Sequence, residues 1–132
     1  MRFLLDTHVL VAWALGAPKL TRAQTRAVAT ASSEAPLGLA DISLWEVASL
    51  VERRKLRLDL PLREWLDQAS SPPLVQRLSL SPAVAAELAT LSTTHDWDPA
   101  DRIIVATARI YGLRLVTSDQ RISESGLVPV VD

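Results

Sequence analysis

Four acidic side chains stand along the sequence where a folded chain can gather them: Asp6, Glu46, Asp101 and Asp119. Asp6 and Asp119 each follow a short apolar run, and Glu46 and Asp101 fall near the starts of two helical patterns. Carboxylate oxygens are the ligands that Mg²⁺ and Mn²⁺ prefer, and two such ions about 3.5–4 Å apart can hold both oxygens of a phosphoryl displacement. If the four side chains converge, we predict a divalent metal site for phosphoryl chemistry.

Three of these carboxylates also have an ordinary structural explanation. Asp6 and Asp119 suit the N-cap of the helix that follows each of them, and Glu46, three residues after Ser43, fits a capping box. Four acids crowded together without a cation would repel one another, so a shared pocket requires a metal or raised pKa values. Helix capping and metal binding both remain open for these side chains.

Asp101 is the acid that a purely structural role explains least well. It shares a helix face with Ile104, Val105 and Ala108, in a segment that is apolar almost all round. Such a pattern indicates a buried helix. A carboxylate on a buried helix is costly unless it is paired, protonated or bound to a metal.

The elements that must position these acids alternate between strands and helices. Strands are predicted near residues 2–5, 36–40, 74–80, 113–116 and 127–131. Helices are predicted near residues 9–14, 21–31, 43–51, 62–69, 81–91 and 98–111. This alternation favours one α/β domain over residues 1–132, with a parallel sheet covered by helices on both faces and the proline-containing last strand at an edge. Ligands of such sheets bind beyond the carboxyl ends of the strands.

The composition is that of an ordinary soluble chain. It has 132 residues, 48% of them hydrophobic and 22% charged, a net charge of −1 and no cysteine. The lack of cysteine excludes disulfides, zinc-thiolate sites and thiol nucleophiles, and it favours a cytoplasmic location. No apolar run approaches the ~20 residues needed to span a bilayer, and the acidic residue at position 6 argues against a signal peptide. Because the net charge is near zero, any RNA binding must rely on a local site.

The pattern resembles PIN-domain nucleases, and more narrowly the VapC-type toxins of toxin–antitoxin pairs. Four stretches carry the resemblance, in the family's order and across nearly the whole chain. They are residues 3–10 (Phe-Leu-Leu-Asp-Thr-His-Val-Leu), 43–47 (Ser-Leu-Trp-Glu-Val), 98–108 (Asp-Pro-Ala-Asp-Arg-Ile-Ile-Val-Ala-Thr-Ala) and 115–119 (Leu-Val-Thr-Ser-Asp). The resemblance implies a three-layer α/β/α PIN-like fold with a central parallel sheet of about five strands.

The resemblance also implies roles for particular residues. The positions matching Asp6, Glu46, Asp101 and Asp119 form the acidic pocket that holds Mg²⁺ or Mn²⁺ in such proteins. The metal lowers the pKa of a bound water, which attacks an RNA phosphodiester. Asp6 and Asp101 are expected as direct ligands, and Glu46 and Asp119 as ligands that act directly or through water.

Three further residues are expected to support the site. Thr117 or Ser118 is predicted to hydrogen-bond Asp6 and hold it in place. Asp98 fits the N-cap before Pro99, and capping is the favoured role for it over metal binding.

By the same resemblance, the chain is expected to be the toxin of a two-component system, an endoribonuclease. A small antitoxin protein would cover the acidic pocket, with an arginine or lysine entering it, and the toxin would form a homodimer. No membrane association is expected. Transfer, ribosomal and messenger RNA all remain open as targets.

The sequence lacks residues that two other functions require. A phosphotransfer signalling domain needs a lysine near the last strands, but the only lysines are Lys19 and Lys55. A phosphatase with Asp6 as nucleophile needs a second aspartate two residues on, where His8 stands. A PIN-like domain that has lost catalysis and only binds a partner remains as an alternative.

The remaining conspicuous side chains have weaker patterns. Trp13 and Trp45 fall at helical spacing, which favours the core, whereas Trp65 and Trp97 lie near predicted boundaries and suit a partner-facing surface.

The two histidines and one basic run also have weak patterns. His8 is expected in a hydrogen-bonded structural role, His95 at the surface, and the basic run 53–57 as a solvated helix end or an RNA-backbone contact.

Overall fold

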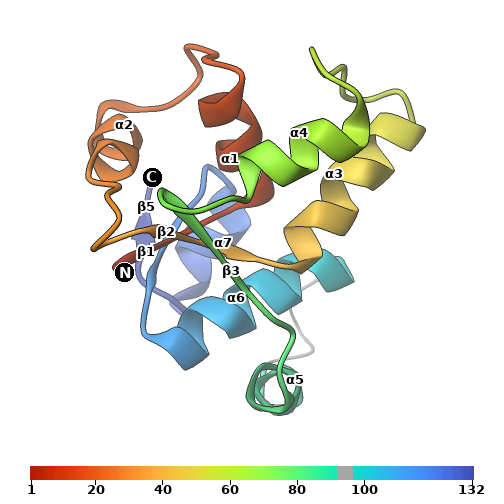
Figure 1. Ribbon diagram of the computed structural model, residues 1–132. Helices are drawn as coiled ribbons and strands as arrows, with labels where there is room; N and C mark the ends of the chain where they lie inside the picture. The colour runs from red at the N-terminus through yellow and green to blue at the C-terminus, as the bar shows by residue number, and fades with distance from the viewer. Residues whose placement is uncertain (92–96) are drawn as a thin grey trace.

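The computed structural model describes residues 1–91 and 97–132, and its centre is a parallel sheet. The five strands are hydrogen-bonded in the order β3-β2-β1-β4-β5, and each neighbouring pair is parallel. Their bounds are β1 Phe3–Leu5, β2 Leu37–Ala40, β3 Val75–Leu78, β4 Arg114–Val116 and β5 Val130–Val131. Figure 1 shows β1 and β2 running side by side with their carboxyl ends toward the right of the view. The predicted sheet is confirmed, with the last strand at an edge.

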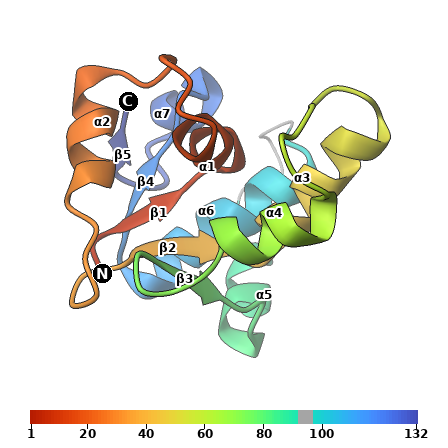
Figure 2. The same cartoon turned by 45° about the horizontal axis from the view of Figure 1, so that its top comes forward.

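Helices cover both faces of this sheet (Figures 1 and 2). Within the described residues they are α1 Thr7–Ala14, α2 Arg22–Ala29, α3 Ile42–Glu52, α4 Leu62–Ala69, α5 Pro82–Leu88, α6 Pro99–Tyr111 and α7 Gln120–Ser125. One apolar cluster joins Leu5 of β1 to residues of α1 to α4, and a second joins Leu4 to residues of α5, α6 and α7. Since successive strand residues point to opposite faces, these clusters are the two halves of a three-layer α/β/α core.

Local sequence signals place most of the helix ends. Thr21 and Gln24 form a reciprocal capping box at the start of α2. Ser81 caps α5 ahead of Pro82, and Gly112 ends α6 in the left-handed conformation, with φ of 64°. His95 lies outside the described residues, and no helix among those described is long and apolar enough to cross a membrane.

Helix α3 differs from the expectation at its first turn. It begins at Ile42, with Asp41 at the N-cap position, so the prediction of Ser43 as the N-cap is wrong. Strand β2 ends at Ala40 and the chain turns almost at once into the helix, which leaves Ser43 buried inside the first turn. Glu46 therefore does not take part in a capping box with Ser43.

Three of the four tryptophans lie differently from the prediction, whereas Trp13, predicted in the core, is partly buried and packs against it. Trp65 and Trp97 are buried, whereas Trp45 is 60% exposed. Helix α3 buries Ser43 and Val47, which are four residues apart on one face, and Trp45 lies halfway between them on the other side of the helix. Trp45 is at the surface because it lies on the face of α3 that is turned away from the core.

Candidate active site

The sheet topology brings Asp6 next to the chain that follows β4. Leu5 at the end of β1 is in register with Val116 at the end of β4, so Asp6 and Thr117 leave the sheet side by side. The Thr117 hydroxyl donates to Asp6 Oδ2 at 2.7 Å, and the backbone N–H of Thr7 donates to Oδ1 at 2.8 Å. Asp6 is only 5% exposed. Asp6 therefore caps α1 and is also fixed at the carboxyl edge of the sheet.

Glu46 reaches the same edge from α3. The Thr7 hydroxyl donates to Glu46 Oε1 at 2.5 Å and lies 2.9 Å from the Ser43 hydroxyl. Thr7 and Ser43 are fully buried, so this contact joins the first turns of α1 and α3 in the interior. Thr7 thus fixes Glu46 near Asp6, a role that the sequence pattern did not reveal.

The start of helix α6 contributes two acids, Asp98 at the N-cap and Asp101 in the first turn. Asp98 Oδ1 accepts the backbone N–H of Asp101 at 3.1 Å, which confirms Asp98 as the N-cap before Pro99. Each of Glu46, Asp98 and Asp101 offers a carboxylate oxygen, and these three atoms lie within 4.8 Å of one another. Asp98 therefore caps α6 and also lies close to the other acids. The sequence analysis had treated capping and metal binding as alternatives for this residue.

Asp119 completes the acidic edge and is tied to an arginine. It caps α7 by accepting the backbone N–H of Arg121 at 3.0 Å, and its Oδ2 lies 2.7 Å from Arg121 Nη2. The same Nη2 lies 3.3 Å from Asp101 Oδ2. Arg121 therefore joins acids from two different elements, and the sequence interpretation missed it. The sequence signal that could have identified Arg121 is its position two residues after Asp119, an aspartate expected at an N-cap.

The electrostatics of the acids reflect their burial and their closeness. Burial raises the pKa of Asp6 and of Glu46 above its ordinary value. Burial, followed by repulsion from neighbouring acids including Asp98 and Asp6, raises the pKa of Asp101 to about 7. Hydrogen bonds from Arg121 instead lower the pKa of Asp119. Without a cation, the folded pocket thus resists carrying its full negative charge.

Two nearby residues behave differently from expectation. Of the two residues expected to hold Asp6, Thr117 does so, whereas the Ser118 hydroxyl accepts a hydrogen bond from the side-chain amide of the buried Gln24 at 3.0 Å. His8 is exposed, and its charge lowers the pKa values of Asp6 and Glu46. It is therefore close to the acids, at the rim rather than in the core.

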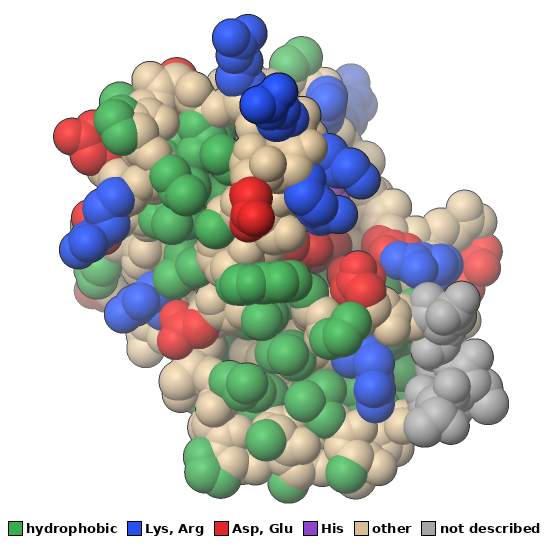
Figure 3. All heavy atoms as spheres, turned by 90° about the vertical axis from the view of Figure 1, so that its right-hand side faces the viewer, with side chains coloured by type: hydrophobic (Ala, Val, Ile, Leu, Met, Phe, Trp, Pro, Cys, Tyr) green, Lys and Arg blue, Asp and Glu red, His purple; other side chains and the backbone are tan. Residues whose placement is uncertain are grey.

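The donor set is suited to a hard divalent cation. Among the described residues, the side chains that converge closely enough to hold an ion are Glu46, Asp98 and Asp101, and their carboxylate oxygens are the ligand type of Mg²⁺ and Mn²⁺. Figure 3 looks onto the side of the molecule at the right of Figure 1, where acidic side chains gather next to Lys or Arg side chains and exposed hydrophobic ones. This edge can hold a cation, and a phosphate could reach it from solvent.

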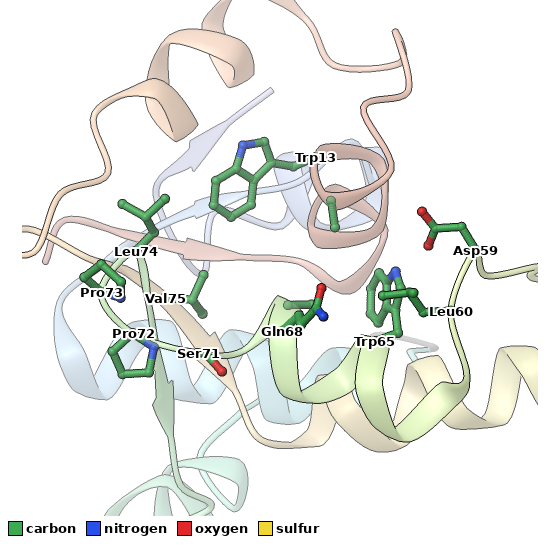
Figure 4. Close-up of a pocket in the computed structure, with 12 residues that line it drawn as sticks. Trp13, Asp59, Leu60, Trp65, Gln68, Ser71, Pro72, Pro73, Leu74 and Val75 are labelled. Carbon is green, nitrogen blue, oxygen red and sulfur yellow. The ribbon is translucent and has the colours of Figure 1, made fainter.

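Two cavities are separate from the group of acids. One, of about 410 Å³, lies between α1, α4 and the segment before β3, with Trp13 and Trp65 in its wall (Figure 4). Its described lining includes none of the four predicted site acids, so it is not the chemical site. A second cavity, of about 390 Å³, is lined mostly by apolar side chains, and His8 and Ser118 are also in its lining.

The comparisons with known proteins agree with this architecture. The PIN domain family model matches residues 3–126, and the chain belongs to the PIN-domain family. Ribonuclease VapC22 of Mycobacterium tuberculosis is 38% identical to it over 119 residues, which are 90% of this chain and 88% of the relative.

Solved structures show the same fold. VapBC2 from Rickettsia felis, bound to a DNA fragment from their promoter, has a TM-score of 0.74 at 16% identity, and the match covers 98% of this chain and 97% of that one. A toxin–antitoxin complex from Klebsiella pneumoniae has a TM-score of 0.67 at 20% identity, with 98% and 95% covered. At these identities the likeness concerns the fold alone.

Proposed function

We propose that this chain is a Mg²⁺- or Mn²⁺-dependent endoribonuclease and the toxin of a toxin–antitoxin pair. The observation that carries the proposal is the convergence of Glu46, Asp98 and Asp101, whose oxygens lie within 4.8 Å of one another. Asp6 and Asp119 lie close enough to raise the pKa of Asp101. This site belongs to a PIN-domain chain that is 38% identical to a protein named as a ribonuclease.

In this proposal Asp6, Glu46, Asp101 and Asp119 form the acidic pocket, and Asp98 joins them. A bound divalent cation would lower the pKa of an attacking water and stabilise the leaving oxygen of an RNA phosphodiester. The protein's part is to hold the carboxylates in place before any cation arrives.

Two hydroxyl groups perform that positioning. Thr117 fixes one oxygen of Asp6 from the end of β4, and Thr7 fixes one oxygen of Glu46 from the start of α1. Each of these carboxylates keeps its second oxygen, or a second lone pair, for a cation. Because both hydroxyl groups are buried, water does not compete for the carboxylate oxygens that they bind.

The second cavity supports an antitoxin as the partner. Its lining includes apolar residues of α1, Leu50 of α3, the two lysines Lys19 and Lys55, and His8. A partner segment with apolar side chains and flanking acidic groups would fit it, and an arginine or lysine at the end of that segment could enter the carboxylate pocket. By the family resemblance we also propose a homodimer and a cytoplasmic location.

The test is cleavage of a mixed RNA pool by the purified protein with Mn²⁺, with Mg²⁺ and with chelator. Asp6→Asn and Asp101→Asn should abolish cleavage, whereas Asp59→Asn, the same change at an exposed acid, should leave it intact. Folding of each variant is checked by circular dichroism. Metal-independent cleavage, or full activity of either pocket variant, would refute the proposed mechanism. A wild-type protein that binds Mn²⁺ and cleaves no RNA would favour the catalytically inactive binding module.

A further inference from the structure

The second cavity is separate from the acids, but part of its wall belongs to the segments that hold Asp6. His8 and Ser118 are both in the lining of this cavity. His8 directly follows Thr7, whose backbone N–H donates to Asp6. Ser118 directly follows Thr117, whose hydroxyl donates to the other oxygen of the same carboxylate. The cavity therefore adjoins the acidic edge of the sheet.

Two lysines enter the same lining from the other ends of α1 and α3. Helix α1 starts at the acidic edge, and Lys19 comes after its end at Ala14. Helix α3 starts at the same edge, since β1 and β2 are parallel neighbours, and Lys55 comes after its end at Glu52. A helix rises 1.5 Å per residue, so the ends of α1 are about 10 Å apart. Both lysines thus join the cavity wall from helix ends that point away from the acids.

The charge of these lysines is not offset by nearby acids. Lys19 and Lys55 are exposed and make no ion pair with another described residue; the ion pairs between described residues use arginines of other segments. The described lining of the cavity contains no Asp or Glu. Arg53, Arg54 and Arg57 lie on either side of Lys55 and are exposed as well. Figure 3 shows Lys and Arg side chains gathered in the upper part of that face, with acidic side chains below them.

This distribution of charge is suited to an RNA strand that passes the acids. A strand with one phosphodiester at a cation in the acidic pocket also carries neighbouring phosphates, and the carboxylates repel these. Lysine is a compact charge on a flexible stem, which suits phosphate contacts that fix the register of a strand. Its stem covers apolar surface while the ammonium group stays in water. Because the net charge of the chain is −1, affinity for RNA requires such a local group of cations.

We propose that Lys19 and Lys55 form a second phosphate-binding subsite, which holds the RNA backbone beside the acidic pocket at phosphates other than the one that is cleaved. This inference rests on the proposed ribonuclease function and adds to it the path of the strand. The antitoxin segment proposed for this cavity would exclude RNA from the same lysines. In the competing explanation, the lysines are solvated or bind only acidic groups of a partner protein.

The experiment compares two double variants with wild type: Lys19→Gln with Lys55→Gln, and Lys19→Arg with Lys55→Arg. The matched control is Arg22→Gln with Arg26→Gln, which removes two exposed positive charges from α2 and gives the same net charge as the glutamine variant. Helices α2 and α3 lie on opposite sides of α1 (Figures 1 and 2), and neither control residue is in the cavity lining.

Four quantities are measured for each protein. Binding of a fluorescent single-stranded RNA pool is followed by anisotropy at several salt concentrations, with Ca²⁺ in place of Mn²⁺ to limit cleavage. Mn²⁺ binding is measured by calorimetry without RNA, and thermal unfolding checks the fold. The values of kcat and KM are measured on an RNA that the wild type cleaves.

Loss of the two lysine contacts should weaken RNA binding and its dependence on salt. The slope of log affinity against log salt should fall by about 0.7 for each contact, or about 1.4 for the glutamine variant. Its affinity at low salt should fall about fivefold for each contact, or roughly twentyfold in all. KM should rise with kcat unchanged, because the contact is the same in the bound substrate and in the transition state. The arginine variant and the control should keep the wild-type slope, and Mn²⁺ affinity should change little throughout.

Three results would overturn the inference. Wild-type RNA affinity and salt slope in the glutamine variant would leave the lysines to solvent or to a partner protein. Equal losses in the glutamine and arginine variants, or a lower unfolding temperature together with weaker Mn²⁺ binding, would assign the lysines a structural role. If wild type binds and cleaves no RNA with any metal, the proposed function itself fails, and that outcome is seen before any variant is compared.

Discussion

Replacing Asp101 by asparagine should make the metal-free protein more stable while removing the proposed ribonuclease activity. Asp101 is 8% exposed, and its pKa is raised from 3.8 to about 7, first by burial and then by the acids around it. A raised carboxyl pKa means that the folded protein holds the proton more tightly than the unfolded chain does. The stability linked to Asp101 is therefore fully present below about pH 4, and it is lost as the pH rises toward 7. Asparagine does not ionise and escapes this loss.

The size of the stability change follows from the rise in the pKa of Asp101. A move from 3.8 to about 7, at about 1.4 kcal/mol for each pH unit, corresponds to at most about 4 kcal/mol above pH 7. The Asp101 side chain keeps 12% exposure and has Arg121 at 3.3 Å, and both reduce the penalty. We therefore expect the Asp101→Asn variant to be about 2 kcal/mol more stable at pH 8, or roughly 6 °C in Tm for a chain of this length.

The assay is urea unfolding in chelator at pH 5 and at pH 8, with Asp59→Asn as the exposed control. The stabilising effect of Asp101→Asn should be clear at pH 8 and much smaller at pH 5, and the control should show little change. Saturating Mn²⁺ should then stabilise wild type, by about 2.7 kcal/mol at a hundred times Kd, and stabilise the variant less. If Asp101→Asn is less stable than wild type at pH 8 without metal, the contact with Arg121 outweighs burial and our account of the pocket is wrong.

Three further changes test other parts of the structure. Thr117→Val keeps the side-chain shape but removes the bond to Asp6, so Mn²⁺ affinity measured by calorimetry should fall about tenfold or more, and unchanged affinity would exclude this positioning role. Gly38→Ala should lower the unfolding free energy in urea by about 1–3 kcal/mol, because its new Cβ would lie 3.0–3.2 Å from packed side chains; a neutral result would mean that these neighbours move easily. Gln24→Leu should cost about 1–2 kcal/mol in the same assay, since it leaves Ser118 without its partner; equal stability would show that water replaces that bond.

Much of the fold could be predicted because its signals are local. Short apolar runs that alternate with capped helices define parallel strands, and signals such as the serine before Pro82 and the glycine at position 112 set helix ends. The acids at positions 6 and 119 could be placed at the carboxyl edge for the same reason, since each directly follows a strand pattern. At these helix ends and at these two acids, the structure agrees with what the local sequence predicts.

The rest of the site depends on the order of the strands, which no local pattern contains. The Thr7–Glu46 hydrogen bond joins residues 39 positions apart, and it exists because β1 and β2 are neighbours. Asp98 was predicted correctly as a cap, but its closeness to Glu46 follows from how α3 packs on α6. Arg121 was missed because it is recognised as part of the site only through its contact with Asp101, which lies on another helix.

The same contacts explain how the fold tolerates this pocket. Asp6, Asp98 and Asp119 each accept a backbone N–H at the start of a helix, where a negative charge is favoured. Asp101 has no such role in capping its own helix, and burial and the neighbouring acids raise its pKa to about 7. A helix start can thus hold an acid without any metal, whereas the acid one turn inside the helix is stable as a carboxylate only beside a cation. On this basis a metal ion bound at Asp101 should add to the stability of the fold.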